Sequence, residues 1–412
     1  MTSSAFKRPR KWRLAWMIRR AIPVPFGWHT RYMVMGYCRH TFLVACAILV
    51  IALSIDLTFF LAKLLAVVPP SHTSSTFFLL VRFCILRGTD FLAELLPLIC
   101  FFGVFWTEIA HTTSRERLTV WLSGRTPNQC LLPALLFGLI VGVSQLVLNY
   151  YVRPLAVMTM AEDRLGTYGE RFDPRPLPYP QWFAAGDDIV QAMVEPGEPA
   201  SLRDVKIYCM NPSLSLQTFF RANVAKPISR GKWRLIDGYR WSSPQDASQS
   251  NLAAFDVKPP AMEARTPFAE ETIDLELSPI WLNTYRVNAR YLTHDVFSAL
   301  GKEHFSPDSE YRTWGQVRWS LPMFCVALSL LATSLSLMLI ARGTGFLQLA
   351  IIAGAGYFAN TLMKLLILLG EHGYVKVAVA GWLMPLITLA VCPLMTLLRR
   401  KLPINLRQIP EK

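Results

Sequence analysis

The stretch Thr41–Val68 reads TFLVACAILVIALSIDLTFFLAKLLAVV and contains only two charged side chains, Asp56 and Lys63. A helix needs roughly 20 apolar residues to cross about 30 Å of hydrocarbon, so this segment is long enough to span a bilayer. Further apolar runs are Phe91–Thr107, Leu131–Val152, Trp319–Ile340, Phe346–Leu369 and Val375–Leu398. The sequence therefore predicts an α-helical membrane protein with six transmembrane helices, three on either side of a long inserted segment.

The composition of the whole chain agrees with this prediction. Of its 412 residues, 52% are hydrophobic and only 17% are charged, whereas soluble domains carry about 25% charged residues. The formal net charge is +14, which is typical of proteins that bind nucleic acid or a membrane surface. The positions of the basic residues decide between these two.

Basic residues gather in one set of the predicted loops. The segment Arg153–Thr313 holds 18 of the 42 Lys and Arg and 21 of the 28 Asp and Glu, which leaves 24 basic and 7 acidic residues elsewhere. The basic clusters are Lys7–Arg20, a loop with Arg115, Arg117 and Arg125, a loop with Arg342, and Arg399–Arg407. With six crossings all of them lie on one side, which the positive-inside rule makes cytoplasmic. We expect an inner-membrane protein with cytoplasmic N- and C-termini, and no nucleic-acid binding.

Cysteine usage gives no sign of a disulfide framework or a metal site. Seven of the eight cysteines lie in or beside the apolar runs, and Cys209 stands alone in the inserted segment. A disulfide there would need a second cysteine in the same compartment. No Cys-x-x-Cys or Cys/His ligand spacing occurs, so we expect no metal and no other cofactor.

The inserted segment is predicted to form a β domain. Short stretches rich in β-branched and aromatic residues alternate with Pro, Gly, Asn and Ser. They are Ile189–Val194, Val205–Met210, Leu216–Val224, Trp233–Trp241 and Thr272–Leu277. In Trp233–Trp241 apolar and basic residues alternate around a turn-like Asp237-Gly238, a pattern typical of an antiparallel sheet with one buried face. No segment of helical period lies between the strands, so we expect a sandwich or jelly roll.

A short helix is predicted between the second and third apolar runs. Thr113 and Glu116 fit a capping box, and Gly124 suits the residue that follows a helix end. Three apolar residues share one face at helical spacing, namely Leu118, Trp121 and Leu122. A helix this short is marginal in water unless it packs on something. From these residues alone, an interfacial helix on lipid headgroups and a helix docked in the groove of a cytoplasmic partner are equally supported.

Several stretches, in chain order, resemble the lipopolysaccharide-export permeases LptF and LptG. They are Ile55–Leu57, Leu95–Pro97 with Thr113–Gly124, Gly231–Gly238, and Leu369–Gly373 with Trp382 and Pro385. The first two are similar to the family's first helix and to its second helix with the coupling segment. The third resembles its Gly-x-Trp-x-Leu-x-Asp-Gly strand, and the last its Leu-Gly-Glu-Ser-Gly loop before the final helix. The chain departs from the family pattern at Arg117 and Trp121, and the resemblance leans to LptG.

The resemblance implies the membrane half of an ABC exporter. Such permeases act as an LptF–LptG pair with a dimer of the ATPase LptB, and they extract lipopolysaccharide from the inner membrane. A β-jellyroll domain then passes the lipid to the periplasmic bridge proteins LptC and LptA. The chain contains no G-x-x-x-x-G-K-[ST] phosphate loop, so hydrolysis through that motif would belong to another chain and this one is not expected to be an enzyme. The implied ATPase-coupling helix comprises Arg115, Glu116, Arg117, Leu118, Trp121, Leu122 and Gly124.

Charged residues inside membrane runs are functional candidates by default. The candidates for the lipid pathway are Asp56, Lys63, Arg82, Glu94 and Lys364. Lys63 could meet lipid phosphates as a point charge, whereas snorkelling to headgroups explains Lys63 and Arg82 equally well. Lys364 lies in an apolar helix, so we expect it to pair with an acidic residue of a neighbouring helix or of a partner permease.

Two alternatives belong to other classes of protein. A membrane-anchored envelope enzyme would use Asp187, Asp188, His294 and His304, which form no recognisable constellation of a base and an orienting partner. Other mechanotransmitting ABC permeases carry the external domain after the first of four helices, unlike this chain. The expected organisation is a basic extension at 1–40, helices at 41–152, a periplasmic β-jellyroll domain at 153–313, helices at 314–398 and a basic tail at 399–412.

Overall fold

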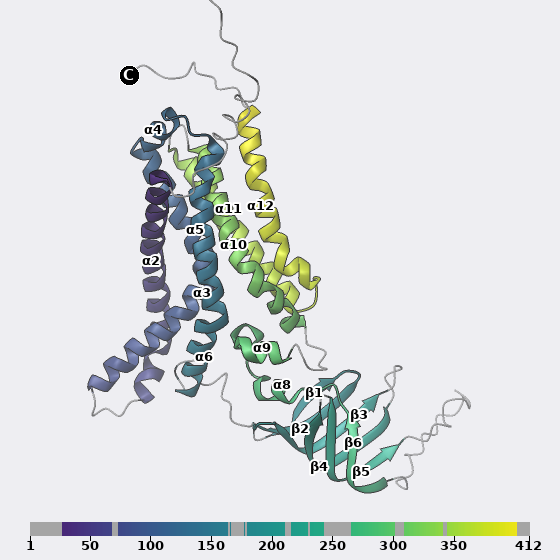
Figure 1. Cartoon of the computed structure of the whole chain (residues 1–412). Helices are drawn as coiled ribbons and strands as arrows, with labels where there is room; N and C mark the ends of the chain where they lie inside the picture. Colours follow the sequence, from purple (N-terminus) through teal and green to yellow (C-terminus); the bar gives the residue numbers. More distant parts are fainter. Residues whose placement is uncertain are drawn as a thin grey trace, which may run out of the picture. The chain divides into compact units, whose positions relative to one another are not determined.

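The computed structural model describes residues 27–67, 73–163, 165, 177, 179–210, 216–229, 231–242, 265–300, 309–340 and 344–401. The predicted basic cluster Lys7–Arg20 and the tail beyond residue 401 lie outside these residues. The chain divides into two compact units (Figure 1). One comprises Met1–Val157 with Ser309–Lys412, and the other comprises Met158–Asp308.

The first unit is helical. Its elements are α2 (Trp28–Val67), α3 (Thr73–Thr113), α4 (Glu116–Leu122), α5 (Pro127–Val147), the π-helical η1 (Leu148–Val152), the first part of α6 (Arg153–Glu162), α10 (Ser309–Leu339), α11 (Phe346–Glu371) and α12 (Val377–Lys401). Within the described residues six helical segments are long and apolar enough to cross a membrane, α5 with η1 and α6 forming one of them. The predicted arrangement of three helices before the insertion and three after it is confirmed.

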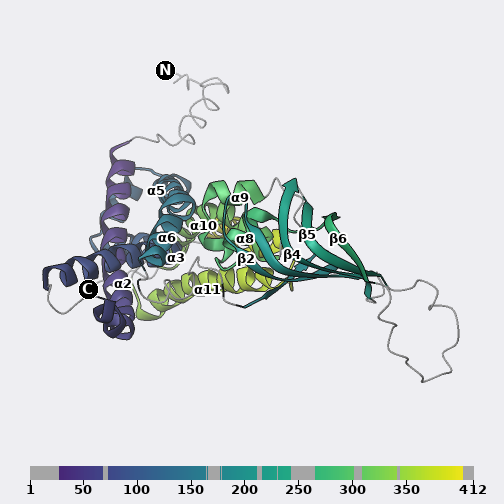
Figure 2. The ribbon, with the colours of Figure 1, turned by 90° about the horizontal axis from the view of Figure 1, so that it is seen from below.

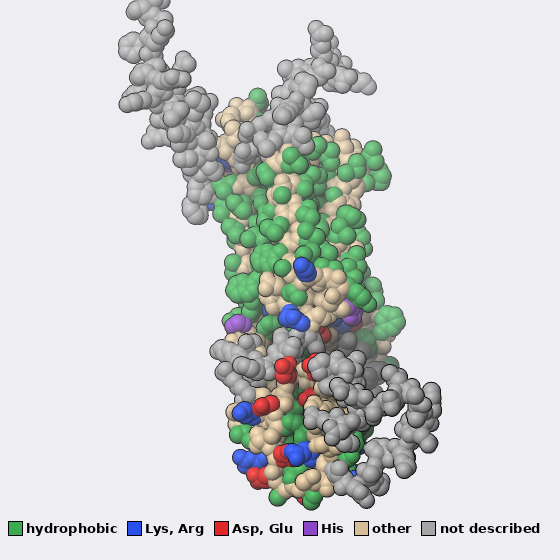
Figure 3. Space-filling model, turned by 90° about the vertical axis from the view of Figure 1, so that its right-hand side faces the viewer, with side chains coloured by type: hydrophobic (Ala, Val, Ile, Leu, Met, Phe, Trp, Pro, Cys, Tyr) green, Lys and Arg blue, Asp and Glu red, His purple; other side chains and the backbone are tan. Residues whose placement is uncertain are grey.

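Helix α10 lies at the centre of this unit and packs against α3, α5, α11 and α12. Glycines in α5 allow this helix to approach α10 closely. A Cβ added at Gly138 would lie 2.8 Å from the Val326 Cα, and one at Gly142 would lie 2.8 Å from the Pro322 carbonyl oxygen. Membrane helices pack in this way because small residues let their backbones come close. On the face drawn in Figure 3, hydrophobic side chains cover much of the helical unit, as expected for a surface that meets lipid.

Two helix starts differ from the sequence prediction. Helix α2 begins at Trp28, so residues 28–40 continue the first span instead of belonging to an extension. Helix α3 begins at Thr73 rather than near Phe91 and includes the charged residues Arg82, Arg87 and Asp90. These residues lower the local hydropathy, so the first part of the helix does not form part of a predicted apolar run.

The second unit contains an antiparallel sheet, which confirms the predicted inserted β domain (Figure 2). Its strands are β1 (Gln181–Ala185), β2 (Asp188–Glu195), β3 (Ser201–Met210), β4 (Leu216–Ser229), β5 (Lys232–Ser242) and β6 (Arg265–Asp274). They pair antiparallel in chain order within one sheet. Among the described strands no crossover interrupts this meander, because each strand pairs with its neighbour in the chain.

The core of the β domain lies on one face of this sheet. Trp233, Leu235 and Ile207 are fully buried there, and the Trp233 indole N–H donates to the Leu277 carbonyl at 3.1 Å. Helix α8 (Pro279–Thr284) contributes Leu282 to the same core. The short elements η4 (Ala289–Tyr291) and α9 (His294–Leu300) complete the described part of this unit.

Strand β5 changes the face that it presents at Asp237. This residue has φ 53°, a left-handed conformation that interrupts the alternation of side chains. Trp233 and Leu235 therefore face the core, whereas Tyr239 lies opposite Arg221 and Trp241 opposite Phe219, on the other side of the sheet. The predicted antiparallel sheet with one buried face is present, and β5 changes face at the predicted interruption, Asp237-Gly238.

Candidate functional site

The segment between α3 and α5 forms a short helix at the predicted place. Helix α4 follows α3 after a sharp turn in which Arg115 has φ 60°. The expected capping box is wrong, because Thr113 is the last residue of α3 and its hydroxyl donates to the Ala110 carbonyl at 3.0 Å. Gly124 has φ 82° and donates its N–H to the Trp121 carbonyl at 2.9 Å. It therefore takes the predicted position after the helix end.

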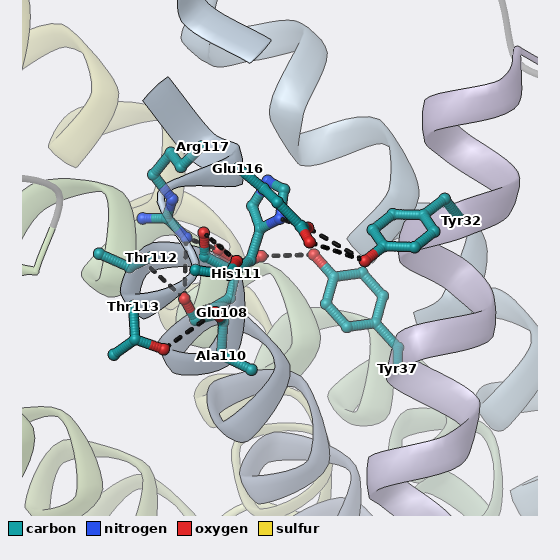
Figure 4. A network of polar contacts seen from close by, with 10 residues as sticks. Tyr32, Tyr37, Glu108, Ala110, His111, Thr112, Thr113, Glu116 and Arg117 are labelled. Atoms are coloured by element: carbon teal, nitrogen blue, oxygen red, sulfur yellow. Dashed lines mark hydrogen bonds and ion pairs between the residues drawn. The ribbon is translucent and has the colours of Figure 1, made fainter. Parts of the chain in front are cut away.

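The Glu116 carboxylate ties α4 to α2 and to the end of α3 (Figure 4). The Tyr32 hydroxyl donates to it at 3.0 Å, and His111 Nδ1 lies 2.9 Å from the same oxygen. Burial alone would raise the pKa of the Glu116 carboxyl, but the hydrogen bonds from His111 and Tyr32 outweigh burial and lower it. At pH values above the ordinary carboxyl pKa, this contact therefore stabilises the fold. The stabilisation is lost as the pH falls through the lowered pKa of Glu116.

A second, buried set of contacts joins α4 to α2, α3 and α10. The Arg117 guanidinium pairs with the Glu108 carboxylate, which also accepts from the Tyr37 hydroxyl. Arg117 also donates to the Ser336 carbonyl of α10 at 3.3 Å. Only 4% of Arg117 is exposed, so this side chain faces inward. Arg117 therefore belongs to the implied coupling helix but is not exposed to a partner protein.

The apolar face of α4 is exposed, whereas Arg117 on its other side is buried. Leu118 is 55% exposed and Leu122 is 80% exposed, while Trp121 is half-buried. One side of the helix is therefore held by polar contacts, and the other side offers leucines that no other part of the described chain covers. An exposed apolar stripe on a short, anchored helix is a suitable surface for a partner protein.

A chain of charged side chains with alternating sign runs through the helical unit. In order it comprises Asp56, Arg87, Asp90, Arg153, Glu94 and Lys364, and we call it the charge ladder. The successive N···O distances are 2.9, 3.0, 2.7, 3.7 and 3.0 Å. The ladder joins α2, α3, α6 and α11. Ionisable groups at membrane depth are costly unless they are paired, so the ladder allows these helices to carry charges.

Half of the ladder is predicted from the sequence. Asp56, Glu94 and Lys364 were candidates, and the structure gives Lys364 an acidic partner, Glu94, within the same chain. Arg87, Asp90 and Arg153 were missed, since they lie outside the strongest apolar runs. The spacing of Arg87, Asp90 and Glu94, which places them on one helix face, was the available signal.

The remaining lipid-pathway candidates are Lys63 and Arg82. Lys63 lies near the end of α2, but its side chain is outside the described part of the structure. Arg82 is exposed on α3. The ladder itself is buried at Asp56 and Asp90, whereas Glu94 and Lys364 are nearly half exposed at its other end.

The residues proposed for an enzyme are dispersed. Asp187 is exposed in the β1–β2 turn, Asp188 accepts the Met210 N–H at 3.2 Å, and His294 begins α9. His304 lies outside the described residues. Burial and the neighbouring Asp188 raise the pKa of the Cys209 thiol to about 12, which disfavours a reactive thiolate. In the described ranges no three His, Cys, Asp or Glu side chains are placed to hold a metal ion.

Comparison with protein families decides the class of this chain. A family model described as lipopolysaccharide export system permease LptF/LptG matches residues 35–400. The chain belongs to the LptF/LptG permease family. The matched range includes α4, the whole charge ladder and the β domain. LptF/LptG permeases are membrane proteins of the lipopolysaccharide export system. A permease is a component of a transporter, which is a different class of protein from an enzyme. The model covers LptF and LptG together, so the choice of LptG remains a prediction. The search among curated proteins found no match.

The Tyr32 hydroxyl is expected to hold α4 against α2 in this LptF/LptG permease. In Tyr32→Phe, Glu116 loses one of its hydrogen bonds, which typically costs about 1 kcal/mol at a partly exposed site. Trypsin should then cleave at Arg115 and Arg125 several times faster in the detergent-solubilised chain. The matched control is Tyr357→Phe, which removes an exposed hydroxyl from α11. Equal cleavage rates in Tyr32→Phe and the wild type would contradict an anchoring role.

Proposed function

We propose that this chain is a permease subunit of an ABC transporter that extracts lipopolysaccharide from the inner membrane and passes it to a periplasmic bridge for outer-membrane assembly. Family membership, the six helices and the inserted β domain support this function. The observation that carries it is α4, a short helix fastened by Glu116 and Arg117 with Leu118 and Leu122 exposed. It suits a permease that receives force from a separate ATPase.

The contacts of α4 suggest how that force would reach the membrane. Glu116 connects α4 to α2 through Tyr32, and Arg117 connects it to α3 through Glu108 and to α10 through Ser336. A displacement of α4 by an LptB-like ATPase dimer would therefore move several helices together. Interfaces of this kind shift between packed arrangements instead of deforming gradually.

The proposed partners follow from the surfaces that the chain leaves open. In α2, Phe42, Ile51 and Phe59 are largely exposed, so this helix would face lipid or the second permease of the LptF/LptG pair. The β domain would pass lipopolysaccharide to LptC- and LptA-like bridge proteins. Lys364 is the ladder residue best placed to meet a lipid phosphate, because nearly half of its side chain is exposed.

The proposed orientation places both termini and α4 in the cytoplasm. A reporter that is active only in the periplasm should give signal after Asp246 and none after Arg125 or Lys412. A reporter that is active only in the cytoplasm should give the reverse pattern, because the basic loops are retained inside. Periplasmic signal at Arg125 would contradict both the topology and the coupling role of α4.

Co-purification tests the proposed function as a whole. The full chain, isolated in mild detergent from cells that make lipopolysaccharide, should carry a cytoplasmic ATPase, a second permease and bound lipopolysaccharide, all identified by mass spectrometry. A preparation that holds none of these under conditions where the chain remains folded would contradict the proposal.

A further inference from the structure

The face of the β sheet opposite the core carries two ordered rows of side chains. We call this surface the outer face. The first row is Ile189, Tyr208, Phe219 and Trp241, which lie opposite one another on β2, β3, β4 and β5. The second is Trp182, Gln191, Lys206, Arg221 and Tyr239, in register from β1 to β5. None of these side chains belongs to the buried core of the domain.

The aromatic side chains of the outer face touch one another across the strands. Trp182 stacks on Tyr208 with ring centroids 5.8 Å apart, and Tyr208 lies 5.0 Å from Phe219. Phe219 in turn lies 6.3 Å from Tyr239, over which the Arg265 guanidinium sits at 5.1 Å. Trp182 is 60% exposed, and the other rings are half-buried. The rings therefore form a continuous platform that is accessible from outside.

Positive charge accompanies this platform. Lys206 and Arg221 lie directly opposite each other on β3 and β4, and like charges in that position destabilise a sheet. Gln191 accepts from the Lys206 ammonium at 3.2 Å, and Asp204 lies 3.6 Å from the Arg221 guanidinium. Among the described residues only one acidic side chain, Asp204, is paired with these two adjacent cations, and an anionic ligand lying across both would balance the remaining positive charge.

We propose that the outer face binds an anionic oligosaccharide, with sugar rings on the aromatic platform and acidic groups at Lys206 and Arg221. A sugar ring has an apolar face of C–H groups and a rim of hydroxyls, so stacking on an aromatic ring buries the first and leaves the second to polar side chains and water. This inference rests on the proposed function, because lipopolysaccharide would bring such a saccharide to the domain. The interleaving of apolar and charged rows suits a saccharide better than a protein partner, whose contact would need an apolar centre with charges at the rim.

The test uses the full chain in detergent and a phosphorylated oligosaccharide prepared by removing the lipid from lipopolysaccharide. Affinity is measured by calorimetry. Trp182→Ala should weaken binding at least fivefold, because it removes the most exposed ring. Arg221→Gln should weaken binding of the phosphorylated probe by a similar factor but change little for the same probe after phosphatase treatment. The matched control is Arg203→Gln, which removes an exposed, ion-paired arginine of β3 outside the two rows.

Three results would overturn the inference. They are no binding of the probe to the wild type, equal binding to wild type and Trp182→Ala, or loss of a co-purifying periplasmic protein in Trp182→Ala without loss of the oligosaccharide. Crosslinking of intact lipopolysaccharide in the same preparations shows whether only the outer-face site is wrong or the proposed function is wrong as well. If intact lipid still crosslinks to the wild type while the delipidated probe does not bind, only the outer-face site is wrong.

Discussion

Asp90→Asn is expected to lower the free energy of unfolding by about 3–5 kcal/mol, the usual cost of removing one partner of a buried ion pair. Asp90 contacts both Arg87 and Arg153, at 3.0 and 2.7 Å, and its side chain is only 4% exposed. The substitution keeps the volume of the side chain, so the loss reports on charge. Two guanidinium groups at membrane depth would lose their shared carboxylate, which makes this the most damaging single change in the charge ladder.

The measurement is thermal unfolding of the detergent-purified chain followed by tryptophan fluorescence. Asp90→Asn should melt several degrees below the wild type. Lys364→Ala should have a smaller effect, because it acts at the exposed end of the ladder. Asp187→Asn, an identical substitution in an exposed turn, should stay within about 0.5 kcal/mol of the wild type. If Asp90→Asn and Asp187→Asn melt together, the ladder does not stabilise the helical unit.

The second large effect concerns the apolar face of α4. A variant with both Leu118→Asp and Leu122→Asp should bind the cytoplasmic ATPase at least a hundredfold more weakly, because each change places a charge where an apolar anchor would enter a groove. Trp121→Ala alone should weaken binding about thirtyfold, since truncating a buried Trp anchor costs about 2 kcal/mol. Pull-down of the ATPase by the immobilised chain measures both changes.

The control for this experiment lies on the same helix. Thr119→Asp adds a charge to α4 at an exposed position beside the apolar face. It should retain most of the ATPase binding, and lipid crosslinking should be unchanged in every variant. Should Thr119→Asp prove as harmful as the double leucine variant, added charge rather than a specific apolar contact would explain the loss.

The parts of this molecule that could be predicted from sequence are those with a local signal. Six apolar runs are visible because spanning a bilayer requires about 20 apolar residues in a row. The β domain is visible because its strands alternate and are separated by turn residues. The apolar spacing and Gly124 correctly predicted the position of helix α4, although the predicted capping box of Thr113 and Glu116 was wrong.

The features that escaped prediction depend on contacts between distant segments. Arg87 and Asp90 lie in a membrane-length helix, where Asp56 and Arg153 from other helices pair with them. The sequence placed Arg117 in the coupling helix without a partner, but the left-handed Arg115 that precedes α4 directs the chain so that Arg117 pairs with buried Glu108. A single left-handed residue, Asp237, likewise moved Tyr239 to the outer face of the sheet.

In the proposed function, α4 couples an external ATPase to extraction of lipopolysaccharide. The most direct test places the chain, its partner permease and the ATPase in proteoliposomes that contain lipopolysaccharide and follows transfer of the lipid to a periplasmic bridge protein by photocrosslinking. The wild type should transfer the lipid only when ATP is present. The Leu118→Asp, Leu122→Asp variant should lose this transfer but still crosslink lipid without ATP. Equal ATP-dependent transfer by the variant, or transfer that does not require ATP, would rule out coupling through α4.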